Sequence, residues 1–438
     1  MGIGRARYRM MPEQTWFGQP RGLTVLFLTN MWEQFSYYGM RALLVYYMTK
    51  QLLLGQAHAS FIYGAYTAGA YFTPILGGLI ADRVLGKRRA IVLGGAIMCA
   101  GHFMMTFEPL FYAALATIAI GNGLFLPCLP SQVGDLYKPD DQRRGWAYNV
   151  YYVGINIGGF LAPLICGTLG EVYGWHYGFG VAGIGMGLGL VIYLSGQRHL
   201  PPERKPARAT EARPLAFDPK VAAVLLGIGL AVTLFRSAYE QVGNTVALWA
   251  DSGIDRSAGS LAIPMTWFQS LNPLFVMLLT PPLLHFWRRR AEAAGDTAPL
   301  HRMAMGALIV AGAYAMLATI AWTTGPARAN WMWLAAFFLI FTFGELFILP
   351  TGLGLFARLA PLSLGATTVA AWFFITFTGS LSAGVVGTLW SRLAPAPFFL
   401  VLAGLACLSA LLLRLLSAPT ETIEQRTAQN VRKSAEMD

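Results

Sequence analysis

Five ionisable side chains lie inside long apolar stretches of the sequence, where a charge is unfavourable. A charged side chain at the centre of a membrane helix costs about 2.5 to 3.5 kcal/mol on insertion scales, so it usually faces a partner or a water-filled cavity. These few charges therefore mark the first place to look for chemistry. The five are Glu33, Arg41, Arg236, Glu240 and Glu345.

The spacing of these charges predicts that some of them share a helix face. Arg41 follows Glu33 by eight residues, so on a helix both point to a similar face about 12 Å apart. Arg236 precedes Glu240 by four, and side chains at that spacing are neighbours. A buried carboxylate whose guanidinium can move away is a physical route to proton coupling. Static salt bridges between helices are the alternative.

The elements that hold these residues are predicted to be membrane-spanning helices. The chain has 438 residues, of which 55% are hydrophobic and 12% charged, against roughly a quarter charged in an ordinary soluble domain. Apolar runs of about 20 residues recur along it, long enough to cross a bilayer as helices. We count twelve such runs, and the alternating pattern of a β-barrel is absent. The prediction is an all-α membrane protein.

The basic residues indicate an orientation in the membrane. Most of the 32 Lys and Arg lie in the N-terminal arm, the C-terminal tail and the turns expected on the same side, which the positive-inside rule places in the cytoplasm. No cleaved signal peptide is read at the N-terminus. We therefore expect an inner-membrane protein with both termini cytoplasmic. The net charge of +11 then reflects topology and contact with anionic lipid rather than nucleic-acid binding.

The chain divides into two similar halves. "WEQF" from Trp32 resembles "YEQV" from Tyr239, and "GFLAPLICGTL" from Gly159 resembles "GSLSAGVVGTL" from Gly379. Two six-span halves in the same orientation are the parallel repeat of the major facilitator fold, which binds substrate at the midplane between its halves. The predicted organisation is a cytoplasmic arm at 1–22, six spans at 23–196, a polar cytoplasmic linker at 197–219, six spans at 220–416 and a cytoplasmic tail at 417–438.

A loop motif supports the same fold. "GGLIADRVLGKRR", from Gly77 to Arg89, matches the G-x-x-x-D-R-x-x-G-R/K-R/K signature of the major facilitator superfamily. In that superfamily the loop latches the inward gate, so Asp82 and Arg83 are assigned to gating. Plain positive-inside charge is the alternative explanation.

Several segments together resemble the proton-dependent oligopeptide transporter (POT) family of that superfamily. "EQFSYYGMRALL" resembles the family's first-helix motif, "YYVGINIGG" its fifth, "AYEQVG" its seventh, "QSLNPLF" its eighth and "GELFILPTGL" its tenth. The resemblance covers both halves in the correct order. It implies uptake of di- and tripeptides driven by protons.

The resemblance also implies roles for individual residues. The peptide carboxylate would be held by Arg41, Tyr37 and Tyr38. The peptide amine would be met by Asn156, Asn272 and Glu345. Trp372 would form an aromatic wall, and Tyr66 is added as a further substrate-binding candidate. Glu240 would pair with the first-helix arginine as an outer gate and take part in proton coupling.

This sequence departs from the family pattern at two places. The first-helix motif should read Glu-x-x-Glu-Arg but has Asn30, Glu33 and Gln34, and the fourth helix has Leu126 where the family has a lysine. Arg236 stands where the family usually has an aromatic residue. We expect proton coupling to shift to Glu240, with two arginines competing for it, while Glu33 supports the cavity.

Other functions remain open at this point. The same fold could carry nitrate, a glycoside or a drug, or act without protons. A membrane enzyme or receptor is disfavoured, because no catalytic Ser-His-Asp, H-E-x-x-H or metal-ligand pattern occurs. Four cysteines without CxxC spacing suggest neither a disulfide framework nor a zinc site. We expect a monomer that uses no cofactor besides the coupling proton.

Overall fold

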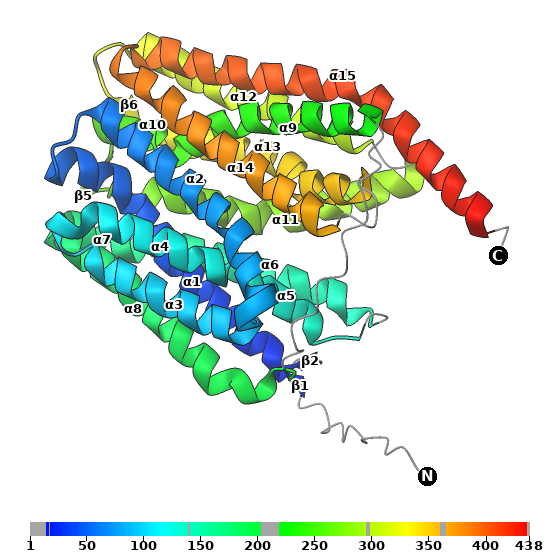
Figure 1. Cartoon of the computed structure of the whole chain (residues 1–438). Helices are drawn as coiled ribbons and strands as arrows, with labels where there is room; N and C mark the ends of the chain where they lie inside the picture. Colours follow the sequence, from blue (N-terminus) through cyan, green and yellow to red (C-terminus); the bar gives the residue numbers. More distant parts are fainter. Residues whose placement is uncertain are drawn as a thin grey trace.

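A computed structural model shows a long helical protein (Figure 1). It describes residues 15–16, 18–138, 141–202, 219–294, 298–359 and 365–435. Most of the predicted N-terminal arm and polar linker, and the last three residues, lie outside these ranges. Within them, eight helical segments are long and apolar enough to cross a membrane. The prediction of an all-α membrane protein is confirmed at this level.

We call the helices from α1 to α8, together with the short 3-10 or π-helical segments labelled η1 to η5, the first half. The first half consists of α1 (Arg21–Tyr46), η1 (Tyr47–Gln51), α2 (Gln56–Ile80), η2 (Ala81–Leu85), α3 (Lys87–Met104), η3 (Glu108–Leu110), α4 (Phe111–Phe125), α5 (Cys128–Asp135), α6 (Arg143–Ala162), η4 (Pro163–Gly167), α7 (Thr168–Tyr173), α8 (Trp175–Gly196) and η5 (Gln197–His199).

We call the helices from α9 to α15 the second half. The second half consists of α9 (Pro219–Tyr239), η6 (Glu240–Gly243), α10 (Thr245–Ser252), α11 (Trp267–Ala294), α12 (Pro299–Thr324), α13 (Trp331–Leu359), α14 (Gly365–Thr388), η8 (Leu389–Ser391) and α15 (Pro395–Ala435).

The described strands are all two residues long and pair only with one another. The antiparallel pairs are β1 (Thr15–Trp16) with β2 (Gln19–Pro20) and β4 (Ser257–Ala258) with β5 (Leu261–Ala262), and the parallel pair is β3 (Ile254–Asp255) with β6 (Ala329–Asn330).

Local sequence explains where the helices are interrupted. Proline lacks an N–H donor and disturbs a helix interior. The helix is accordingly interrupted at Pro127, between α4 and α5. The passage from α6 into α7 runs through a π-helical turn that begins at Pro163. The turn into α3 uses Gly86 at φ 78°, a left-handed conformation that favours glycine. The second glycine of the loop motif thus has a structural reason.

The apolar cores follow the division into halves. One large cluster is built only from residues between Val224 and Leu413. A second cluster is built from first-half residues between Phe35 and Ala182, joined by Ala247 and Met265 of the second half. A third lies between Leu23 and Leu200. Most apolar side chains are therefore buried within their own half, and among the described residues only the second cluster extends across the boundary between the halves.

The two halves touch along α2 and α14, which run side by side in Figure 1. A Cβ atom built on Gly64 would lie 2.2 Å from the Cα of Gly384, so only glycine fits at this point of contact. Nearby, Ser60 donates a hydrogen bond to the side-chain oxygen of Asn244 at 2.9 Å. The chain therefore joins the halves by close backbone packing here.

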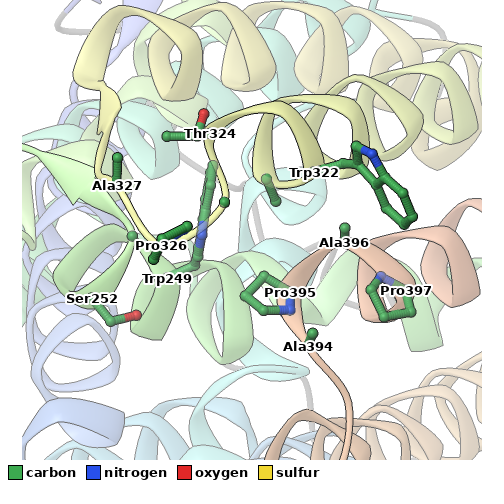
Figure 2. A pocket seen from close by; sticks show the side chains of 13 residues that line it. Trp249, Ser252, Trp322, Thr324, Pro326, Ala327, Ala394, Pro395, Ala396 and Pro397 are labelled. Carbon is green, nitrogen blue, oxygen red and sulfur yellow. The ribbon is translucent and has the colours of Figure 1, made fainter.

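A cavity of about 480 Å³ opens between α10, the end of α12 and the start of α15 (Figure 2). Trp249 and Trp322 contribute aromatic rings to it, and prolines such as Pro395 line it together with small residues such as Ser252 and Ala396. None of the residues that line it is ionisable. It offers little chemistry for recognising a charged solute, and the predicted site residues lie elsewhere.

Candidate functional site

Three of the predicted charges meet at the boundary between the halves. α9 ends at Tyr239, and Glu240 begins the short 3-10 turn that follows. One oxygen of Glu240 accepts a hydrogen bond from Arg41 on α1, and the other accepts one from Arg236 on its own helix. Glu240 is only 1% exposed. One buried carboxylate therefore holds two guanidinium groups, one from each half.

Tyrosine side chains surround both guanidinium groups. Arg41 donates from Nε to the Tyr63 hydroxyl at 2.5 Å, and its guanidinium lies 5.5 Å from the centre of that ring. The Arg236 guanidinium lies 4.8 Å from the Tyr71 ring and 5.6 Å from the Tyr239 ring. Aromatic faces attract cations, more strongly where water is excluded. The rings thus help to keep two cations in a largely dry place.

A second buried acid lies beside this cluster. Glu345 on α13 accepts a hydrogen bond from the Tyr239 hydroxyl at 2.9 Å and another from the side-chain amide of Asn272 at 2.6 Å. The same amide lies 2.9 Å from the Thr342 hydroxyl oxygen. Because Tyr239 directly precedes Glu240, it connects the two acids.

A small cavity of about 40 Å³ lies between these groups. Tyr38 and Arg41 line it from α1, and Gln269 and Asn272 line it from α11. A cavity of this size holds about three water molecules. A cation and the amide that holds Glu345 therefore line one small cavity, which must widen to admit anything larger than water.

The remaining residues predicted for substrate binding on α1 and α6 are placed differently. The Tyr37 ring packs edge-on against Tyr38 at 5.4 Å and belongs to the first-half core. The Asn156 amide donates to the Tyr152 carbonyl oxygen of its own helix at 2.9 Å. Within the described residues Asn156 bonds inside its own helix and Asn272 bonds to Glu345 and Thr342, so no hydrogen bond joins the two asparagines.

Glu33 lies apart from the central cluster. Its carboxylate accepts a hydrogen bond from the neighbouring Gln34 amide at 2.7 Å, and it is fully buried. Among the described residues it has no ion pair. Tyr66 and Tyr151 lie close enough to interact electrostatically with Glu33. The buried Tyr66 hydroxyl has no hydrogen-bond partner among the described residues.

The predicted aromatic wall and loop residues lie outside the small cavity. Trp372 on α14 packs against the second-half core and against Gly352. Asp82 and Arg83 are exposed on η2. Near this loop, the ion pair found among the described residues is formed by Lys87, whose Nζ lies 2.7 Å from the Asp135 carboxylate.

The sequence prediction missed the tyrosines that support the charges. Tyr63 and Tyr71 share a helix with the predicted Tyr66, and their repeated occurrence on a span beside two buried arginines could have indicated them. Tyr239 adjoins a predicted acid directly. Each holds a predicted site residue in place.

The small cavity thus lies between groups of opposite charge: Arg41 lines it, and Asn272, which also lines it, holds the Glu345 carboxylate. In the ranges that the structure describes, no cluster of three His, Cys, Asp or Glu side chains could hold a metal ion.

Comparison with known proteins gives matches along both halves. The model of the POT family matches residues 88–213 and 218–397. A di-/tripeptide transporter of Lactococcus lactis subsp. cremoris is 30% identical, over 93% of this chain and 97% of its own length. A peptide transporter of Yersinia enterocolitica is 31% identical, over 85% of this chain and 88% of its own.

Solved structures agree with these matches. A crystal structure of a peptide transporter POT in complex with sulfate aligns with a TM-score of 0.88 and 28% identity, over 94% of this chain and 97% of its own. A POT family transporter in complex with a thioalcohol-conjugated peptide aligns with a TM-score of 0.84 and 26% identity, over 94% and 99%. The likeness thus covers both the fold and nearly the whole length.

Proposed function

We propose that this protein, which belongs to the POT family, imports di- and tripeptides together with protons by alternating access. The observation that carries the proposal is the shared cavity, which is lined both by Arg41 and by Asn272, whose amide holds Glu345. A short peptide has an anionic carboxylate at one end and a cationic amine at the other, which suits such a pair of opposite charges. Relatives with about 30% identity are named as di-/tripeptide transporters.

We assign the peptide carboxylate to Arg41 with Tyr37 and Tyr38, and the amine to Glu345 with Asn272. Asn156 would join the amine site when the cavity widens, since its present bond is only to its own helix. We assign Tyr66 and Trp372 to the walls around the peptide side chains.

Proton coupling would use the buried acids. We propose Glu240, Arg236 and Glu33 for this role. Glu240 is held by Arg41 across the boundary and by Arg236 on its own helix. When a peptide carboxylate takes Arg41, or when the halves separate, Glu240 loses one of its two cations. This loss favours proton binding, because a nearby cation favours the charged form of an acid.

We further propose twelve spans, arranged as two parallel six-helix bundles at 23–196 and 220–416. The eight apolar segments would be joined as spans by α1, α2, α3 and α11, which are at least 18 residues long and carry many of the polar site residues. The arm at 1–22, the linker at 197–219 and the tail at 417–438 would be cytoplasmic. The protein would be a monomer in the inner membrane, in contact with lipid.

We propose that one gate closes each end of the boundary between the two halves. The arrangement supports an outer end closed by contacts such as Arg41 with Glu240 and Ser60 with Asn244. Asp82 and Arg83, exposed in this structure, would latch the inner end when it closes.

Uptake in proteoliposomes tests the proposal. Labelled dialanine should accumulate only with an inward proton gradient, and unlabelled dialanine should compete, whereas a dipeptide blocked at both ends should not. Arg41→Ala should lose at least tenfold in apparent affinity, while Arg392→Ala, a change of an exposed arginine, should match the wild type. Uptake of nitrate, a glycoside or a drug without competition by dialanine would replace this proposal.

Coupling needs a separate test. Peptide-driven proton uptake should be lost in Glu240→Gln, which keeps the size of the side chain but cannot take up the proton. Coupling equal to that of the wild type in this variant would end the assignment to Glu240.

A further inference from the structure

A carboxylate of the first half caps a helix of the second half. Glu171 lies in α7, and its two oxygens accept hydrogen bonds from the backbone N–H groups of Met265 and Thr266 at 3.0 and 2.9 Å. The Thr266 hydroxyl donates a third, at 2.6 Å. These two residues immediately precede α11, which begins at Trp267. Glu171 therefore occupies the N-terminus of α11 from a position more than 90 residues earlier in the chain.

The physical chemistry of a helix N-terminus makes this contact favourable. The first N–H groups of a helix lack partners within it, and the helix dipole stabilises a negative charge there. Hydrogen bonds to an ionised acceptor are about twice as strong as neutral ones. The Glu171 side chain is 12% exposed, so water competes with these bonds only weakly.

Further charges extend the contact across the boundary between the halves. The Arg256 guanidinium lies 3.9 Å from Glu171 and 3.7 Å from Asp251, whose carboxylate lies 2.8 Å from Lys50 Nζ. Lys50 and Glu171 belong to the first half, and Asp251 and Arg256 to the second. We call these four residues the outer latch. Each cation in it has an anion of the opposite half within 4 Å.

The capped helix leads directly into the central site. Gln269 lies two residues after the start of α11 and donates to the Ala42 carbonyl oxygen at 3.1 Å, next to Arg41. Asn272, one turn later, holds Glu345. Both side chains line the small cavity. A displacement of the N-terminus of α11 would therefore move the groups proposed to bind the peptide.

We infer that Glu171 is a positioning residue that holds the outer end closed by binding the N-terminus of α11, and that it releases this helix when the outer end opens. The inference rests on the proposed alternating access. Rocking of the halves must separate the contacts at one end, and the outer latch joins the halves at the end that contains the Arg41 and Glu240 contact. Its strength then sets the ratio of outer-open to outer-closed molecules, and its release couples that ratio to the shape of the peptide site.

The test is a distance measurement by pulsed EPR in liposomes without peptide. Spin labels at Tyr112→Cys and Trp322→Cys, both exposed positions, report the outer end in a background in which the four native cysteines are replaced. A second pair, at Val84→Cys and Phe286→Cys, reports the other end. In Glu171→Gln the outer-open to outer-closed ratio should rise at least tenfold, and the second pair should move closer together.

Matched variants separate the latch from a general loss of structure. Glu108→Gln changes an acid whose hydrogen bond, among the described residues, comes from Gln51 of its own half, so it should leave both distributions unchanged. Thr266→Val keeps the side-chain shape but loses the hydroxyl donor, so it should shift the ratio in the same direction by a smaller factor, even if Glu171→Gln fails to fold.

Distributions in both Glu171→Gln and Thr266→Val that equal the wild type would overturn the inference. So would broadening of both label pairs without opposite movement, because that result describes loosened packing rather than a gate. These distances need no transported solute. A failure of peptide uptake would therefore contradict the proposed function and leave this measurement intact.

Discussion

The shared carboxylate at the centre predicts an unusual order of stabilities. In Glu240→Gln the two guanidinium groups that bond separate oxygens of Glu240 both lose their counter-charge. Removing one partner of a buried ion pair costs about 3 to 5 kcal/mol. We expect a loss near the upper end of that range, because two cations are left at a site that is 1% exposed.

The arginine variant should be milder. Arg236→Met removes one cation, leaves the apolar stem between the Tyr71 and Tyr239 rings, and keeps Glu240 paired with Arg41. Since the remaining carboxylate stays paired, the expected loss is about 1 to 3 kcal/mol, that of an unmade hydrogen bond to a charged group.

The double variant gives the decisive number. Glu240→Gln with Arg236→Met leaves only Arg41 unpaired, and Arg41 keeps its bond to the Tyr63 hydroxyl. The double variant should therefore lose less stability than the sum of the single changes, by about 0.5 to 3 kcal/mol, as for contacting residues. Unfolding by SDS in mixed micelles measures all three, with the exposed Glu421→Gln as control. Additive losses, or equal losses in the two single variants, would refute a shared carboxylate.

Three further predictions concern the contacts around this cluster. Gly64→Ala should reduce transport strongly, because the new methyl group meets the backbone of the other half, whereas Gly312→Ala, with open space at its Cβ, should transport like the wild type. Asn272→Ala should raise the KM for dialanine at least tenfold, because Glu345 loses its amide donor; an unchanged KM would contradict the amine site. Tyr63→Phe should destabilise the protein in the same SDS titration by about 1 to 3 kcal/mol, since a guanidinium N–H loses its acceptor.

The sequence spacing of the charged residues, and the free-energy cost of burying a charge, predicted part of the site well. The four-residue interval from Arg236 to Glu240 predicted neighbours on one helix face, and the structure confirms the pair. The pairing of Glu240 with Arg41 joins helices about 200 residues apart. No local pattern reports such a contact, so it came only from the family resemblance.

Other features depend on tertiary packing that the sequence does not encode locally. Glu171 appears in the sequence as one acid at the end of a span, and its partners are backbone N–H groups of the other half. Backbone donors have no sequence signature. Similarly, Asn156 satisfies its amide within its own helix, because a side chain can always choose a local carbonyl over a distant partner.

The departures from the family motif divide the buried acids into two unlike environments. Gln34 and Leu126 replace basic residues of the motif, and Glu33 is left with neutral partners among the described residues. Glu240 has the opposite surroundings, because Arg236 brings it a second cation on the same helix. On the proposed alternating access, separation of the halves would take Arg41 away from Glu240, whereas Arg236 lies four residues from Glu240 on the same segment and would stay beside it. On the proposed coupling, a proton that binds Glu240 would therefore compete with Arg236 even when the outer end is open.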